Sequence, residues 1–244
     1  MFEARGLKKS YGALAAVCGV SLSAAAGERH GIIGPNGAGK TTFFNLLSGE
    51  AAADAGDVFM DGKSLGRLPP DARARAGLGR SFQHNSLFAG LTVVENFAIA
   101  AAQRTKLCKI FWRDFFACKE VFEEALDHAH RLGLGAQAHT RAAHLSHGAM
   151  RQLEIGLTLA LRPKVLLLDE PTSGMSPEET AAIKKLIRRL PEELTLLVIE
   201  HDMDVIFDLA SCITVLDYGE VLMQGAPAEV RASPVVRARY LGAG

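Results

Sequence analysis

Short apolar runs alternate with amphipathic segments along much of this chain. The runs at 165–169 and 194–200 have the length of strands buried on both faces, and a third strand is expected at 28–33. A helix is expected at 177–190, because acids fill its first turn and bases its last, which suits the helix dipole. Strands and helices that alternate in this way predict a parallel sheet in an α/β fold.

The remaining segments follow two other patterns. Residues 2–11, 16–24 and 56–64 resemble short strands separated by turns, as in an antiparallel sheet. From about residue 93 to residue 138 the pattern is helical and contains no strand-like run. We therefore expect a core built from both ends of the chain, with a helical subdomain inserted in the middle.

Composition narrows the class of protein. The chain has 244 residues, 48% of them hydrophobic, and 27 basic side chains balance 27 acidic ones. This balance argues against nucleic acid as a partner recruited by bulk charge. The four cysteines form no CxxC pair, so a reduced, cytosolic setting is expected. The apolar runs are too short to cross a bilayer and no signal peptide is expected, so work at a membrane requires docking on another protein.

A glycine-rich loop follows the first predicted strand and leads into an expected helix, KTTFFNLLSG, that ends at Gly49. Residues 34–41 read GPNGAGKT, which matches the pattern G-x-x-x-x-G-K-[ST]. Its glycines let the backbone wrap a phosphate, while Lys40 reaches the β- and γ-phosphates and Thr41 offers a hydroxyl to Mg²⁺. The nucleotide-binding residues predicted here are Gly34, Pro35, Asn36, Gly37, Ala38, Gly39, Lys40, Thr41 and Thr42.

Two carboxylates follow the apolar run at 165–168. In an α/β sheet, ligands bind at the carboxyl ends of strands, which is where Asp169 and Glu170 are expected. Asp169 is the expected partner of Mg²⁺. Glu170 can polarise a water molecule for attack on the γ-phosphate, a role typically worth about 10²–10⁴ in rate.

A second helix start lies at 145–156, which read LSHGAMRQLEIG. Ser146 is a good N-cap residue, and Gly148 lets a ligand approach the backbone. The unpaired N–H groups and the dipole of a helix N-terminus attract anions. The chain is therefore expected to have two helix ends suited to phosphate.

The order of these motifs, with Gln83 in GRSFQ and His201 in VIEHDM, resembles that of the ATP-binding-cassette ATPases over essentially the whole chain. The resemblance implies an α/β fold: a P-loop NTPase (RecA-like) core with an N-terminal antiparallel β subdomain and an inserted helical subdomain. It places the core at 1–83 and 162–244 and the helical subdomain, with the signature motif, at 84–161.

The resemblance also implies roles for single residues. Two cassettes pair head to tail, so that Ser146 and Gly148 contact the γ-phosphate of the ATP held by the partner. Tyr11 stacks on adenine, unless it is a strand tyrosine packed on a turn. Gln83 senses Mg²⁺ and the attacking water and touches a membrane subunit. His201 holds the γ-phosphate, unless it is a satisfied core histidine.

Three positions depart from the common family pattern. The signature has His147 and Ala149 where Gly and Gln are usual, and the loop that crosses to the partner cassette ends in Ser176 instead of Asp. These departures concern the communication between the two ATP sites. The Ser146 and Gly148 contacts remain, so ATPase activity is expected.

The longer stretches narrow the resemblance. LSHGAMRQLEIG, LLLDEPTSGMSPEET, EHDMDVIFDLA, the insert around KLCKIFWRDFF and the terminal RYLG are similar to ATPase subunits of branched-chain amino-acid importers. The ATPases of urea and short-chain amide importers share many of these sequence stretches. Aromatic acids are a further candidate cargo. Such systems combine two ATPase subunits, identical or sister chains, with two permeases and a periplasmic binding protein, so a place on the inner face of the membrane is implied. The alternatives are a soluble cassette in DNA repair, cluster assembly or translation, and a regulator that does not hydrolyse ATP.

Overall fold

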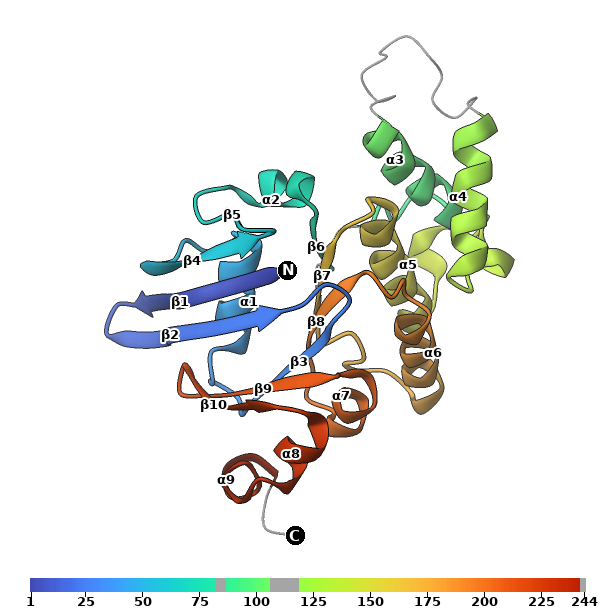
Figure 1. Cartoon of the computed structure of the whole chain (residues 1–244). Helices are drawn as coiled ribbons and strands as arrows, with labels where there is room; N and C mark the ends of the chain where they lie inside the picture. Colours follow the sequence, from blue (N-terminus) through green and yellow to red (C-terminus); the bar gives the residue numbers. More distant parts are fainter. Residues whose placement is uncertain (82–86, 106–118, 242–244) are drawn as a thin grey trace. The chain divides into compact units, whose positions relative to one another are not determined.

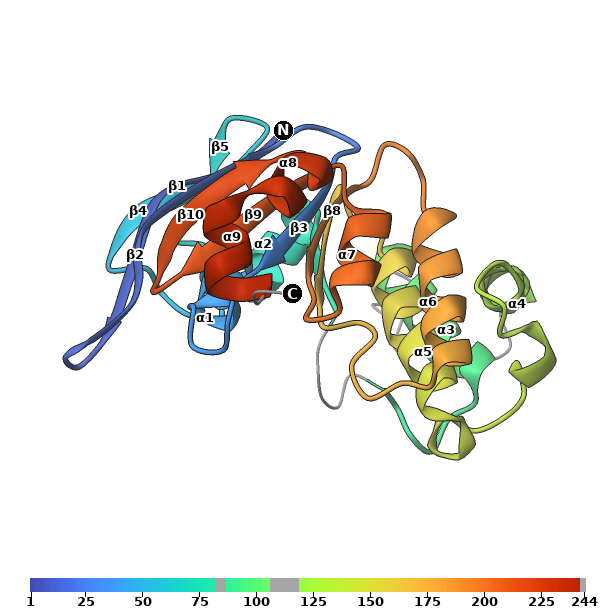
Figure 2. The ribbon, with the colours of Figure 1, turned by 90° about the horizontal axis from the view of Figure 1, so that it is seen from below.

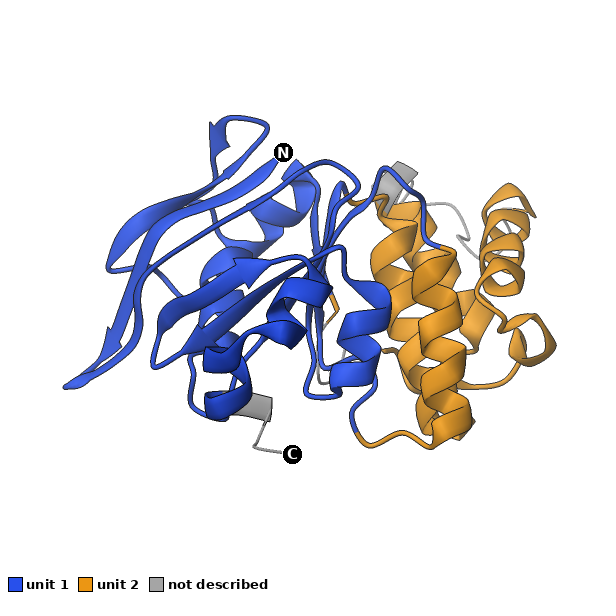
Figure 3. Cartoon of the chain, turned by 60° about the horizontal axis from the view of Figure 1, so that its bottom comes forward, with its two compact units in different colours: residues 1–80, 164–173, 190–244 blue, residues 81–163, 174–189 orange. Residues whose placement is uncertain are grey.

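The structure, a computed structural model, describes residues 1–81, 87–105 and 119–241 (Figure 1). Gln83 and the stretch KLCKIFWRDFF lie outside these ranges. The chain divides into two compact units, coloured in Figure 3: unit 1 comprises residues 1–80, 164–173 and 190–244, and unit 2 comprises residues 81–163 and 174–189. The domain boundaries expected from the sequence stay a prediction.

Unit 1 contains a four-stranded antiparallel sheet in the order β2-β1-β4-β5. Because β1 pairs with both β2 and β4, the first strand of the chain lies inside this sheet. The antiparallel N-terminal sheet predicted from the sequence is confirmed. Its strands are β1 (Phe2–Tyr11), β2 (Leu14–Ala24), β4 (Ala55–Met60) and β5 (Lys63–Ser64).

A six-stranded sheet in the order β10-β9-β3-β8-β7-β6 forms the other part of unit 1. All neighbours are parallel except the edge strand β10, which returns antiparallel to β9. The predicted α/β core is confirmed in β3, β7 and β8, whereas β6, β9 and β10 were not predicted. The strands are β3 (Arg29–Ile33), β6 (Leu78–Arg80), β7 (Val165–Asp169), β8 (Thr195–Ile199), β9 (Cys212–Asp217) and β10 (Glu220–Gly225).

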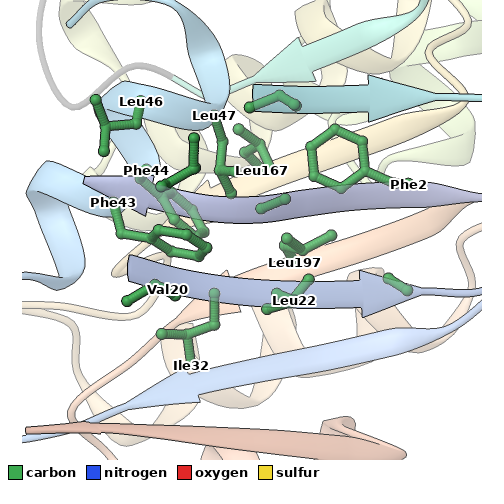
Figure 4. Close-up of a cluster of buried hydrophobic side chains, with 14 of the residues drawn as sticks. Phe2, Val20, Leu22, Ile32, Phe43, Phe44, Leu46, Leu47, Leu167 and Leu197 are labelled. Atoms are coloured by element: carbon green, nitrogen blue, oxygen red, sulfur yellow. The ribbon is translucent and has the colours of Figure 1, made fainter. Parts of the chain in front are cut away.

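The core of unit 1 is built around α1. Phe43 and Phe44 of this helix pack with Phe2, Val20 and Leu197, all buried (Figure 4). Burying side chains of this size stabilises the unit by about 1.5–3 kcal/mol each. The element α8 lies against β9 and β10 (Figures 1 and 2). The helices of unit 1 are α1 (Lys40–Ser48), α2 (Pro70–Ala76), α7 (Met203–Leu209), α8 (Pro227–Ala232) and α9 (Pro234–Val236).

Unit 2 is helical in the part that the structure describes. The helix α3 packs against α4 and α5, and α5 packs against α6. The helical insert and the helix that starts after Ser146 are confirmed. The helices are α3 (Val93–Thr105), α4 (Lys119–Arg131), α5 (His147–Ala160) and α6 (Pro177–Arg188), with short 3₁₀ turns at Gly135–Gln137 and Ala142–His144. Within the described ranges, no helix of either unit is long and apolar enough to span a membrane.

Candidate functional site

The glycine-rich loop joins β3 to α1 in unit 1, as its sequence predicts. Gly37 and Gly39 have φ values of 81° and 94°, which side chains rarely adopt. A Cβ atom on Gly39 would also overlap the carbonyl oxygen of Ala16. Apart from its two chain neighbours, no described residue has an atom within 4 Å of the position of a Cβ on Gly37, so the described structure leaves room for a ligand there. Close backbone packing and space for a ligand thus both require glycine.

Lys40 begins α1 and its side chain lies inside the loop. The residue is 6% exposed, and its Nζ donates hydrogen bonds to the carbonyl oxygens of Gly34 (2.7 Å) and Pro35 (2.9 Å). Burial lowers the pKa of the ammonium group, and the negative charges of Glu170 and Asp169 oppose this. A phosphate oxygen can replace these carbonyl partners and supply the negative charge that they lack.

Asp169 ends β7 and is 1% exposed. Arg80 reaches it from the end of β6, with 3.2 Å between Arg80 Nη2 and Asp169 Oδ2, and also donates to Asn45 Oδ1 (2.8 Å) on α1. The helix α1 packs against β7. The Thr41 hydroxyl and the Asp169 carboxylate are hard oxygen donors of the kind that Mg²⁺ prefers, so the residues present fit this metal ion.

Glu170 follows β7 in a left-handed backbone conformation, with φ of 46°. Such a conformation costs about 1–3 kcal/mol in a residue other than glycine, and it is concentrated at functional sites. The carboxylate Oε1 lies 2.5 Å from His201 Nε2. The side chain of His201 is 45% exposed, so this residue is not a core histidine. The two side chains therefore form an accessible pair in unit 1.

Glu200 is a positioning residue that the sequence analysis missed. It is 2% exposed, and its Oε1 accepts hydrogen bonds from the amide (2.8 Å) and the hydroxyl (2.5 Å) of Thr172. Its Oε2 accepts from the amide of His201 (3.1 Å). One buried carboxylate thus ties the loop after Glu170 to the residue that pairs with Glu170. The available signal was an acid at the end of a buried strand.

The N-terminus of α5 is the second predicted phosphate-binding end, and it lies in unit 2. Ser146 is its N-cap, and the Ser146 hydroxyl accepts a hydrogen bond from the amide of Ala149 at 3.3 Å. The amide of Gly148 donates to Glu179 Oε1 at 2.8 Å. The amide that was predicted to meet a phosphate therefore already has a carboxylate partner.

Glu179 belongs to the first turn of α6. Its Oε2 accepts from the amide of Ser176, and its own amide donates to the Ser176 hydroxyl, which is a capping box. The hydrogen bond from the Gly148 amide is the largest cause that lowers the pKa of the Glu179 carboxyl, followed by that from Ser176. The carboxylate is therefore ionised at neutral pH. Glu179 was not among the predicted site residues.

The structure places the predicted site residues as follows. Tyr11 ends β1 with half of its surface exposed, and Lys9 Nζ lies 5.5 Å from its ring centre. Its stacking on adenine stays a prediction, as does every role expected of Gln83. The loop at 34–42, Asp169, Glu170 and His201 belong to unit 1, whereas Ser146, Gly148 and Ser176 belong to unit 2.

The chain has recognised relatives. The family model described as ABC transporter matches residues 17–173. The chain is 38% identical to the high-affinity branched-chain amino acid transport ATP-binding protein LivG of Salmonella typhimurium, over 99% of this chain and 98% of that protein. It is 37% identical to the protein of the same description named BraF from Pseudomonas aeruginosa, with the same coverage.

Solved structures agree with these relatives. The ADP conformation of MJ1267, an ATP-binding cassette of an ABC transporter, matches with a TM-score of 0.86 and 28% identity, over 100% of this chain and 99% of that chain. The dimeric post-hydrolysis state of the cassette MJ0796 bound to ADP and phosphate matches with a TM-score of 0.78 and 25% identity, over 93% of this chain and 99% of that one.

Proposed function

The chain belongs to the ABC transporter family, and from this premise we propose that it is the ATP-hydrolysing subunit of an importer of branched-chain amino acids. The observation that supports the ATPase part is the pair of phosphate-suited helix ends in one chain, at α1 and at α5. The similarity over nearly the full length to proteins described as branched-chain amino acid transport subunits supports the cargo.

Nucleotide binding is assigned to unit 1. The backbone amides of the loop at 34–42 hold the phosphates, and Lys40 exchanges its carbonyl partners for phosphate oxygens. Tyr11 stacks on the adenine. Thr41, Asp169 and Gln83 would hold Mg²⁺, which when bound neutralises negative charge on the phosphates.

Hydrolysis is assigned to Glu170 and His201. Water attacks the γ-phosphorus, the bond from this phosphorus to the bridging oxygen breaks, and ADP and inorganic phosphate leave. Glu170 orients the water and accepts its proton, since its carboxylate is ionisable and accessible. His201 holds Glu170 Oε1 and reaches the γ-phosphate, and Glu200 fixes the backbone around both residues.

The second phosphate-suited helix end, at α5, supports pairing of this chain with a second cassette. A phosphate at α5 would come from a partner cassette, because the chain already has a complete phosphate loop of its own. In this arrangement Ser146 and Gly148 contact the γ-phosphate held by the partner. The dimer of MJ0796 supports such pairing for a related cassette. Whether the partner is an identical or a sister chain is one outcome of the experiment below.

The remaining partners follow from the transporter assignment. Two permease subunits dock near Gln83 on the inner face of the membrane, and a periplasmic binding protein delivers the cargo. Urea, short-chain amides and aromatic acids are the alternative cargoes. Cells that carry Lys40→Ala in this chain should lose uptake of labelled leucine; preserved leucine uptake together with lost urea or amide uptake would reassign the cargo.

The ATPase and the dimer are tested with Glu170→Gln. The variant should bind ATP while its turnover falls by about 10²–10⁴, the usual contribution of a positioned general base. Light scattering with Mg·ATP should then show the mass double. Near-normal turnover would contradict the role of Glu170. A variant that binds ATP and stays monomeric would identify a sister cassette as the partner, and co-purification of ribosomes or DNA in place of membrane proteins would contradict the importer.

A further inference from the structure

The carboxylate of Glu179 joins the N-termini of two helices in unit 2. Its Oε1 accepts from the Gly148 amide of α5 at 2.8 Å, and its Oε2 accepts from the Ser176 amide, the N-cap of α6, at 3.2 Å. The Ser146 hydroxyl also helps to lower the pKa of this carboxyl group. Glu179 therefore bonds to the Gly148 amide, which is expected to meet a phosphate, and interacts with Ser146 beside it.

Glu179 also fills the space that Gly148 leaves open. A Cβ atom on Gly148 would stand 2.8 Å from both Cγ and Oε1 of Glu179. A phosphate oxygen that accepts a hydrogen bond from the Gly148 amide must lie about 2.7–3.2 Å from that nitrogen, which is where Oε1 lies now. Two anions that approached one amide proton would repel each other strongly at this distance, and Oε1 already fills the position in line with the N–H group. Occupation by Glu179 and by a phosphate is therefore mutually exclusive.

When the Glu179 carboxylate releases the Gly148 amide, it can remain bound to Ser176. The hydrogen bonds of the capping box hold Glu179 to Ser176 at the start of its own helix, where the α6 dipole favours a negative charge. Ser176, which stands where the family commonly has Asp, is neutral and adds no repulsion there. The side chain can turn away from α5 and keep its hydrogen bond to the Ser176 amide.

We propose that Glu179 sets the affinity of the α5 N-terminus for the nucleotide of the partner cassette, by occupying the Gly148 amide until the γ-phosphate displaces it. The inference rests on the proposed cassette dimer. In this proposal, the dimer closes when the γ-phosphate of the partner's nucleotide replaces the Glu179 carboxylate at α5. An isolated subunit is thereby protected from binding stray phosphate at an exposed helix end.

The test is Glu179→Gln, placed in the Glu170→Gln background so that ATP is not consumed. Glutamine retains the capping box but removes the negative charge. An anion at a helix N-terminus is stabilised by a few tenths to one kcal/mol, and a head-to-tail dimer contains two such ends, so the dimer dissociation constant at saturating Mg·ATP should fall by roughly 3- to 30-fold. Analytical ultracentrifugation measures this constant.

The matched control is Glu178→Gln in the same background. Glu178 carries the same charge in the same first turn of α6, but the groups that lower its pKa are its own backbone amide and the Ser176 hydroxyl, neither of which belongs to α5. This control should leave the dimer constant within about twofold, and both variants should bind ATP as monomers with unchanged affinity. An equal or weaker dimer for Glu179→Gln would overturn the proposal, since loss of a merely structural contact does not tighten a dimer.

A second measurement applies to the monomer and does not depend on the dimer. Glu179→Ala removes the acceptor of the Gly148 amide, so hydrogen exchange of that amide should become at least severalfold faster, whereas Glu178→Ala should leave it unchanged. Unchanged exchange in both variants would overturn the internal contact. Faster exchange in Glu179→Ala, combined with a Glu170→Gln protein that never dimerises with itself, would retain the contact and contradict only pairing with an identical chain.

Discussion

The two helix N-termini suited to phosphate, α1 in unit 1 and α5 in unit 2, use glycine for different reasons. Gly39 before α1 has a left-handed backbone, and a Cβ atom there would overlap the Ala16 carbonyl. Gly148 lies in a regular helix, and a Cβ atom there would meet the end of the flexible Glu179 side chain. The fold itself requires glycine at α1, whereas at α5 a Cβ atom would meet only a side chain that can move, so we expect glycine there to serve the approach of a ligand.

The charges at the two ends also differ in sign. Lys40 supplies α1 with a cation whose hydrogen bonds, among the described residues, go to two carbonyl oxygens, so a phosphate adds a directly bonded anion. Glu179 supplies α5 with an anion, so a phosphate must replace a partner that is already present. We therefore expect the first end to bind nucleotide within a single chain. On the proposal above, the second end accepts only a nucleotide that another subunit presents.

Removal of the cation should produce the largest difference between the two ends. Lys40→Ala removes a buried ammonium group that makes charge-assisted hydrogen bonds, each worth about 1.5–3 kcal/mol. The affinity of the monomer for ATP should fall by about 10²–10³, as measured with a fluorescent nucleotide. Ser146→Ala is the matched change at α5 and should leave the affinity of the monomer unchanged. A monomer that loses affinity in both variants would contradict the division of roles.

Replacement of each of the two glycines by alanine should lower stability at Gly39 and impair dimer formation at Gly148. Gly39→Ala should lower the free energy of unfolding by about 2–4 kcal/mol, because it combines a strained φ with backbone overlap. Gly148→Ala should change it by less than about 1 kcal/mol, because alanine favours a helix and Glu179 can move. Urea denaturation measures both values.

Dimer formation completes the glycine comparison. Gly148→Ala in the Glu170→Gln background should bind ATP normally yet fail to double its mass with Mg·ATP, because the methyl group occupies the path of the γ-phosphate. A Gly148→Ala protein that dimerises normally would show that the partner nucleotide does not approach this amide. A Gly39→Ala protein of normal stability would contradict the close packing against Ala16.

Local pattern explains which parts of the molecule were predictable. The strands β3, β7 and β8 and the helix α1 were predicted because short apolar runs and a glycine-rich motif mark them directly. The edge hairpin of β9 and β10 was missed: β10 is only partly buried, so its sequence lacks a clean apolar run. The described helices of the insert, α3 and α4, were predicted from the helical period alone.

Some residues of the candidate site were likewise predictable from local sequence, and others were not. The phosphate loop, Asp169 and Glu170 stand beside the elements that position them, so their sequence context was informative. Glu179 was seen only as an acid that suits the dipole of its own helix. Its bond to Gly148 joins residues 31 positions apart, and Arg80 meets Asp169 across 89 positions. Such contacts depend on how separate elements pack together. The sequence pattern within one element does not indicate them.

The smallest expected effect is the dependence of stability on pH at α5. Hydrogen bonds from Gly148 and Ser176 lower the pKa of Glu179 below its ordinary 4.5 in the folded chain. A group whose pKa is lowered by folding stabilises the fold at pH values above its unfolded pKa, and this contribution disappears as the pH falls through the folded pKa.

The melting temperatures of Glu179→Gln and of the unmodified chain should therefore differ at pH 6 and converge towards pH 3. The difference should be about a few degrees or less, because the carboxylate is accessible to solvent and screened. Asp61→Asn serves as a control in unit 1, since Lys164 and the N-terminal amine lower the pKa of Asp61 to about 2 and its contribution should persist to lower pH. If the Glu179 difference were constant from pH 6 to pH 3, the side chain would act by shape alone. The contrast between a cation at α1 and an anion at α5 would then have no support at α5.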